Sequence, residues 1–232
     1  MSLTSLTAPQ RRVIGVLIEK SLTTPQSYPL SLNAVTTGCN QKSNRDPVIE
    51  YVEEEVDTFL EELKKLHLIT VVYPASGRVE KYRQEFSSML DLDGKEMAVM
   101  GELLLRGAQS VGELRTRASR MKAIESLPEL ESVLDRLEAR EHPLVVRLTP
   151  HGVKRGVRYT HNLYPPAELE RVKAAEPEVS DVAVGPSPSR PAAPAAVVAS
   201  APNATISALE REIRELRERL EIVEGRLGIV AD

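Results

Sequence analysis

The stretch VDTFLEELKKLHLITVV (residues 56–72) has Val56, Leu60 and Leu63 on one face of a helix, which then runs into a β-branched strand. A second stretch, LESVLDRLEAREHPLVV (residues 130–146), repeats this order with Leu130 and Leu134 on the matching face. Two shorter helical patterns precede each stretch, and a turn and a second strand follow it. Three helices followed by a hairpin are the plan of a winged helix, so the sequence predicts two such units in tandem.

The first unit is predicted over residues 1–92. Thr7 is a capping residue followed by an early proline and by Gln10, so a helix is expected to start there. A second helix is predicted over residues 31–37, with Gly38 ending it. A third is predicted over 53–67, and strands over 69–73 and 80–84 flank a turn at Ser76-Gly77.

The second unit is predicted over residues 93–175. Its first helix takes residues 95–106, and capping boxes at Ser110 and Ser126 open helices that reach about residues 119 and 140. Strands near 144–148 and 157–163 are joined by the loop TPHGVKRG. The expected fold class is therefore mainly α with small β wings (α+β), built from two tandem winged helix-turn-helix units.

The tail differs sharply in composition. Residues 176–204 contain six prolines among Ala, Ser and Val, which predicts a flexible, disordered linker. Residues 205–230 carry apolar residues spaced alternately by three and four positions, which predicts a parallel two-stranded coiled coil and hence a homodimer. The candidate dimerisation residues are Ile206, Leu209, Ile213, Leu216, Leu220, Val223 and Leu227. The alternative is a surface helix that packs against its own domain.

Several classes of protein are disfavoured. The start MSLTSLTAPQ has no charged segment and no long apolar run, so no signal peptide or membrane span is expected. A lone cysteine, Cys39, fits a reducing cytoplasm. The four histidines (67, 142, 151 and 161) show no metal-ligand spacing, and no phosphate-binding glycine loop is present. We therefore expect no cofactor, no metal and no catalysis.

The basic residues of the second unit gather in two blocks without acids, residues 114–124 and 142–167. Residues of this kind bind DNA phosphates, and a wing can lie on the same side as the second helix. The candidate contacts are Arg115, Arg117, Arg120, Lys122, Arg147, Lys154, Arg155 and Arg158. The alternatives are an ordinary solvated surface and a docking site for an acidic partner.

The polar loop before the third helix offers a second set of candidates for nucleic-acid binding: Asn40, Gln41, Lys42, Asn44 and Arg45. Asn, Gln and Arg pair with base edges. The same side chains also satisfy backbone groups in irregular loops, and this structural role is slightly favoured. Arg45 could equally pair with Glu53 or Asp57.

The decapeptide Cys39-Asn-Gln-Lys-Ser-Asn-Arg-Asp-Pro-Val48, after TAPQRRVIGVLIEKSLTTPQSYPLSLNAV, resembles the bacterial YceH-like family. The resemblance covers about residues 3–163. It implies a duplicated winged-helix architecture and a cytoplasmic location, and it implies no activity.

Two functions remain open. The first is a dimeric, DNA-binding transcriptional regulator that contacts double-stranded DNA mainly through its second wing. The second is a protein–protein interaction module without DNA binding, by analogy with the tandem winged-helix subunits of chromosome-condensation complexes. The acidic start of the third helix at Glu53-Glu-Glu-Val-Asp57 favours the second, because it would repel phosphates. The basic wing and the fold favour the first.

Overall fold

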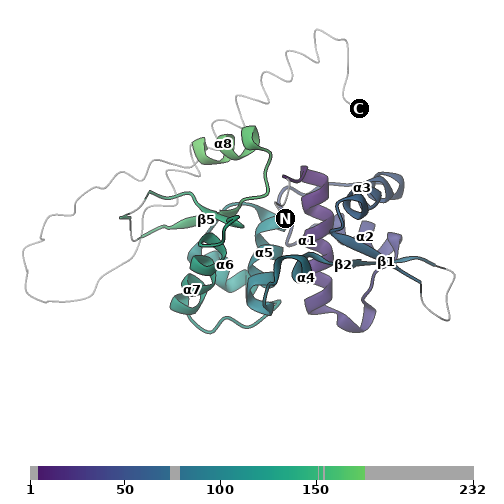
Figure 1. Cartoon of the computed structure of the whole chain (residues 1–232), viewed down its shortest axis with the longest axis horizontal. Helices are drawn as coiled ribbons and strands as arrows, with labels where there is room; N and C mark the ends of the chain where they lie inside the picture. The colour runs from purple at the N-terminus through teal and green to yellow at the C-terminus, as the bar shows by residue number, and fades with distance from the viewer. Residues whose placement is uncertain (1–4, 74–78, 151, 154, 176–232) are drawn as a thin grey trace, which may run out of the picture. The chain divides into compact units, whose positions relative to one another are not determined.

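The computed structural model describes residues 5–73, 79–150, 152–153 and 155–175, which belong to one compact unit (Figure 1). The fold is mainly α-helical with two small antiparallel sheets, as expected. The first half (residues 1–92) contains α1 (Ala8–Thr23), η1 (Pro25–Ser27), α2 (Leu32–Cys39), α3 (Glu53–Lys65), β1 (Ile69–Val72), β2 (Lys81–Gln84) and α4 (Phe86–Leu90). The second half (residues 93–175) contains α5 (Gly94–Arg106), β3 (Gln109–Ser110), α6 (Val111–Ala118), α7 (Leu127–Glu138), β4 (Val145–Arg147), β5 (Arg158–His161) and α8 (Pro166–Ala174).

Local capping fixes the helix starts. Thr7 forms the predicted capping box with Gln10 at the start of α1, and Ser110 forms one with Glu113 at the start of α6. Only one bond of the capping box predicted at Ser126 is present, in which its hydroxyl accepts from the Glu129 amide. The Glu129 carboxylate does not return to Ser126, because it accepts from the Glu125 amide and pairs with Lys95. Sequence reading therefore located these starts within about one residue.

Gly38 does not end α2, contrary to the prediction. It lies inside the helix, and a Cβ there would come within 2.6 Å of Cγ1 of Val16. The glycine instead lets α2 approach α1 closely, which is the second common use of this residue.

The strands pair as two sheets. β1 and β2 form an antiparallel pair, and β3, β5 and β4 form a three-stranded sheet in that order. The two-residue strand β3 pairs Gln109 with Tyr159 and was not predicted, because two residues are too few to carry an alternating pattern. The short helices α4 and α8 were also missed.

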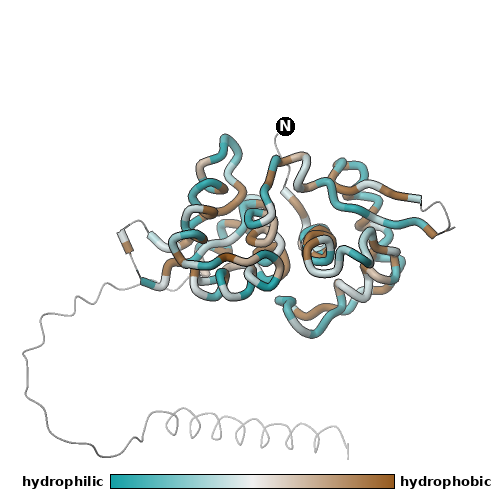
Figure 2. The backbone as a smooth tube through the Cα atoms, turned by 90° about the horizontal axis from the view of Figure 1, so that it is seen from below, coloured by the Kyte–Doolittle hydropathy of each residue, from teal (hydrophilic) through white to brown (hydrophobic). Residues whose placement is uncertain are grey.

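The core is centred on α1 and α5, which pack side by side (Figure 1). Residues 10–19 of α1 and residues 96–105 of α5 are buried without a break. A helix buried all round has protein on every side, so each of these helices serves both halves. Figure 2 shows hydrophobic and hydrophilic residues alternating along the surrounding elements, as expected where one face of each is covered.

Glycines allow this close packing. A Cβ on Gly15 would lie 3.0 Å from Cδ2 of Leu105, and a Cβ on Gly101 would lie 2.7 Å from Cγ2 of Ile18. The contact is reciprocal, since each helix places a glycine against a branched side chain of the other. The two halves are therefore joined through backbone that approaches closely.

The predicted linker (176–204) and coiled coil (205–230) lie outside the described residues. Within the described ranges, no helix is both long and apolar enough to cross a membrane.

Candidate nucleic-acid interface

The arginines of the first basic block are partly neutralised by acids that lie outside the block in the sequence. Arg117 Nη2 lies 3.3 Å from Glu113 Oε1, and its Nη1 donates to Oε1 of Gln109 at 2.8 Å. Arg120 Nη2 lies 3.1 Å from Oε2 of Glu102. The block therefore contains no acid in the sequence, but acids lie next to its arginines in the folded protein.

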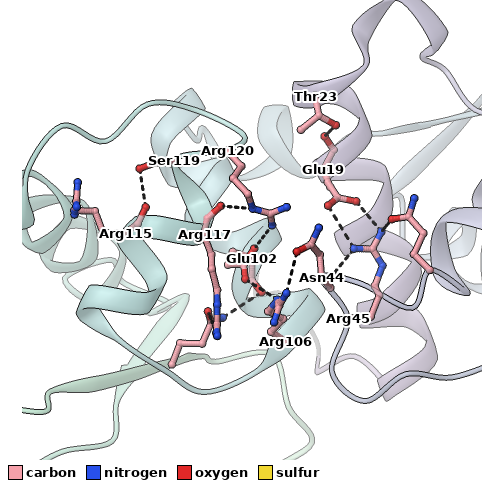
Figure 3. A network of polar contacts seen from close by, with 12 residues as sticks. Glu19, Thr23, Asn44, Arg45, Glu102, Arg106, Arg115, Arg117, Ser119 and Arg120 are labelled. Atoms are coloured by element: carbon pink, nitrogen blue, oxygen red, sulfur yellow. Dashed lines mark hydrogen bonds and ion pairs between the residues drawn. The ribbon is translucent and has the colours of Figure 1, made fainter.

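Glu102 is the centre of this network (Figure 3). Its side chain is 0% exposed, and it lies between Arg120 of α6 and Arg106, whose Nε is 3.2 Å from Oε1 of Glu102. Burial raises the pKa of Glu102, and the two arginines offset part of this effect. Arg106 also donates to Oδ1 of Asn44 at 2.9 Å, which links α5 to the polar loop of the first half.

The other cations of this block keep their charge toward solvent. Arg115 donates to the backbone carbonyls of Ile124 and Glu125 at 3.4 and 3.5 Å. Lys122 is exposed in the loop after α6. A carbonyl is a dipole and carries no net charge, so Arg115 and Lys122 remain available to attract phosphate.

In the β4–β5 hairpin, arginines hold the loop together. Arg147 donates from Nε to the carbonyl of Thr149 at 3.1 Å and from Nη2 to that of Val153 at 2.8 Å. Arg158 donates to the carbonyl of Ala108 at 3.0 Å. Arg155 is exposed, and Lys154 lies outside the described residues.

Arg45 is built into the fold. Its side chain is 0% exposed and lies 2.7 Å from Oε2 of Glu19 on α1 (Figure 3). The same guanidinium donates to the carbonyl of Gly38 at 2.9 Å and to Oε1 of Gln41 at 2.8 Å. Glu53 and Asp57, offered as possible partners from the sequence, were wrong, because the acid that meets Arg45 is Glu19 of α1. This guanidinium is therefore removed from the candidate DNA contacts.

Most of the remaining loop residues also serve the backbone. Asn40 donates to the carbonyl of Tyr51 at 2.8 Å and accepts from its amide at 2.9 Å. These two bonds hold the beginning and the end of the loop together. Asn44 adopts φ of 58°, a left-handed conformation that asparagine tolerates better than most residues. Lys42 is exposed. The structural interpretation of this loop, slightly favoured from the sequence, accounts for the observed bonds.

The exposed faces of both third helices are acidic. On α3, Glu53, Glu54 and Asp57 are exposed, and on α7 the same is true of Glu131 and Asp135. These are the helices that a winged helix would usually place against a DNA groove. Their charge opposes that docking mode.

A hollow of about 400 Å³ lies between α7 and the three-stranded sheet. Its lining residues are Val111, Glu131, Asp135, Arg147, Val153, Val157 and Tyr159. Sequence reading missed this hollow, since its lining comes from α6, α7, β4, β5 and the hairpin loop.

Cys39 and His161 are both buried. Burial raises the pKa of the Cys39 thiol to about 12, which disfavours the nucleophilic thiolate. Burial, followed by the nearby Arg11, lowers the pKa of His161 well below its usual range, and its Nδ1 accepts from the Leu163 amide at 3.2 Å. Among the described residues, no group of three or more His, Cys, Asp or Glu side chains could hold a metal ion.

Two buried arginines on α1 were missed from the sequence. Arg11 forms an ion pair with Glu168 of α8 and lies over the ring of Tyr164, 4.4 Å from its centroid. Arg12 donates to the carbonyls of Cys39 and Pro47 at 3.1 and 2.6 Å. Their one sequence signal was their place within an otherwise apolar helix, where a charge must find a partner.

Comparison with known proteins identifies the family. Residues 6–154 match a family described as "Protein of unknown function, DUF480". The UPF0502 protein YceH of Salmonella newport is 50% identical over 161 residues, which cover 67% of this chain and 75% of that protein. The UPF0502 proteins YceH of Salmonella agona and Salmonella dublin match with the same identity and coverage. This chain belongs to the YceH family.

The YceH family match spans both halves of the described fold. It includes the loop with Arg45, the buried Glu102 and the acidic helices α3 and α7, and it ends within the β4–β5 hairpin loop. The resemblance seen in the sequence is thereby confirmed.

Proposed function

We propose that this YceH-family chain is a dimeric tandem winged-helix protein that binds double-stranded DNA, as a transcriptional regulator, mainly through phosphate contacts of the β4–β5 hairpin. In this proposal each half is one winged helix, and the hairpins are the wings. The order of three helices followed by a hairpin, present in both halves, supports it. The proposed function is binding and not catalysis, and the dimer forms through residues 205–230.

One observation carries the DNA-binding proposal. The β4–β5 hairpin has Arg155 exposed in its loop, while Arg147 donates to the backbone carbonyls of Thr149 and Val153 and keeps its charge. No acid occurs in the chain from residue 142 to residue 167. A hairpin of this charge can follow a phosphate backbone even where the neighbouring helix is acidic.

The geometry narrows the predicted contacts. Arg45 is buried, Arg117 and Arg120 are paired with acids, and Arg147 and Arg158 donate to backbone carbonyls. The described cations proposed to contact DNA are therefore Arg115, Lys122 and Arg155. Lys154 joins them from its position in the sequence. About four phosphate contacts give a slope of log affinity against log salt of roughly −3.6. Affinity should then fall about a hundredfold between about 50 and 200 mM salt.

Fluorescence anisotropy with a random duplex of about 30 bp tests this proposal. The double variant Lys154→Glu/Arg155→Glu should lose most of the binding. The matched control is Lys64→Glu/Lys65→Glu, which makes the same charge change on α3 and should retain it. Equal binding by both variants would refute contact through the hairpin, and the absence of binding at about 50 mM salt would refute the function.

The exposed acids of α3 and α7 favour a second function, protein binding, in which these helices meet a basic partner. It predicts that the full-length chain retains a specific protein from a cross-linked lysate, and that neutralising those acids weakens the complex. A chain that retains nothing would contradict it.

A further inference from the structure

The hollow between α7 and the three-stranded sheet combines an apolar floor with an acidic edge. Val111, Val153, Val157 and Tyr159 supply apolar surface to the lining, and Glu131 and Asp135 line it from α7. The two acids are four residues apart, so they occupy the same face of the helix. An apolar surface bordered by charge of one sign is suited to a ligand with an aliphatic part and the opposite charge.

The carboxylates of Glu131 and Asp135 are exposed, and neither has a hydrogen bond or ion pair to another described residue. Other acids of the second half are used within the fold. Glu129 pairs with Lys95, and Glu113 accepts from Ser110 at 2.7 Å and pairs with Arg117. The two acids beside the hollow are therefore available to a partner.

The one cation in the lining does not neutralise the pair. Arg147 donates to the carbonyls of Thr149 and Val153, which fixes it along the hairpin. The pKa of the Tyr159 hydroxyl is raised by burial and then by Glu138, while Arg147 acts in the opposite direction, and Asp135 and Glu131 raise it further. The lining of the hollow thus carries two acidic side chains and one basic one.

We propose that this hollow binds a basic segment of a protein partner. An aliphatic side chain of the segment lies against Val111, Val153 and Val157, and a neighbouring Lys or Arg meets the carboxylates of Glu131 and Asp135. The charge of the hollow selects this occupant over nucleic acid, whose phosphates these carboxylates repel. The inference rests on the protein-binding function proposed above and gives it a location and a partner chemistry.

The test uses the full-length chain and a fluorescein-labelled peptide, GKVRLKVRG, with the acidic peptide GEVELEVEG as the comparison. Affinity is measured by anisotropy, and the site is located from methyl chemical shifts of labelled valines. The double variant Glu131→Gln/Asp135→Asn removes both charges without changing side-chain size much. Asp46→Asn/Glu50→Gln removes one exposed aspartate and one exposed glutamate, also four residues apart, in the loop before α3 and is the matched control.

The expected result is binding of the basic peptide with a Kd below about 1 mM, with shifts at Val111, Val153 and Val157. Loss of two exposed charge pairs should weaken the affinity about fivefold to tenfold in Glu131→Gln/Asp135→Asn, and the control should change it less than twofold. Equal losses in the two variants, shifts confined to other valines, or no binding would each overturn the site.

A lysate experiment separates this site from the function on which it rests. If a cross-linked protein is retained equally by the wild-type chain and by Glu131→Gln/Asp135→Asn, the proposed site is wrong and the protein-binding function stands. If the wild-type chain retains no protein, the function itself is refuted. Weaker retention by the double variant than by the control supports both.

Discussion

Replacing Gly101 by Ala should destabilise the protein even though alanine is the better helix former. The added Cβ would lie 2.7 Å from Cγ2 of Ile18 and 3.5 Å from the Met121 sulfur. Ile18 is branched at Cβ and has essentially one rotamer in a helix, so that methyl cannot swing away and α1 must shift relative to α5. Overpacking of this kind costs about 2–3 kcal/mol.

Helix propensity works against that cost, since Gly→Ala within a helix contributes about 1 kcal/mol. The net loss in the free energy of unfolding should be about 1–2 kcal/mol, which lowers Tm by about 2–8 °C for a chain of this size. Urea titration followed by circular dichroism at the helix band measures it.

Gly112 provides the matched control. It lies in α6, and a Cβ there would meet nothing within 4 Å, so Gly112→Ala should stabilise the protein by about 0.4–1 kcal/mol. Adding Ile18→Leu, which removes the Cγ2 methyl, should restore part of the stability lost in Gly101→Ala. If Gly101→Ala were as stable as Gly112→Ala, the close packing of α1 on α5 would be refuted.

Three further predictions follow from buried groups. Arg45→Met should lower the free energy of unfolding by about 3 kcal/mol, because the buried Glu19 then keeps only Lys20, whose Nζ lies 3.6 Å from its Oε2. The exposed Lys42→Ala should change it by less than about 0.5 kcal/mol, and denaturant titration compares the two variants. His161 is held neutral by burial with its pKa below the usual 6.5, so the unfolded chain binds a proton that the folded chain does not, and stability is fully present above pH 6.5 and falls below it. By about pH 5.5 the wild type should lose about 1.4 kcal/mol more of its free energy of unfolding than His161→Gln does. Parallel pH profiles of the two proteins would contradict this. The Cys39 thiol, with its pKa raised to about 12, should react with a disulfide reagent only after unfolding, and rapid reaction of the native chain would show that the thiol is accessible.

Local patterns explain why much of the fold could be predicted. The capping boxes at Thr7 and Ser110 each join residues three positions apart, and the apolar faces of α3 and α7 repeat within two turns. Signals of this length are present in the chain before any tertiary contact forms. The sequence by itself therefore determined the helices α1–α3 and α5–α7, the two hairpins and their repeated order, but not the short elements α4, α8 and β3.

The candidate interface depended on which elements become neighbours. The acid that pairs with Arg45 is 26 residues away on α1, and the acid that pairs with Arg120 is 18 residues away on α5. A run of charges along the chain reports composition and not pairing, so the sequence neither identified the acid that meets Arg45 nor showed that Arg120 is paired.

Tertiary structure alone also decided the role of Gly38 and Gly101, and it assembled the hollow beside α7. In the sequence, a glycine that ends a helix cannot be told from a glycine that lets a second helix pack closely. The physical reason is range: the backbone conformation is set by residues within a turn or two, whereas close approach, burial and ion pairing are set by the packing of α1 on α5 and of α7 on the sheet.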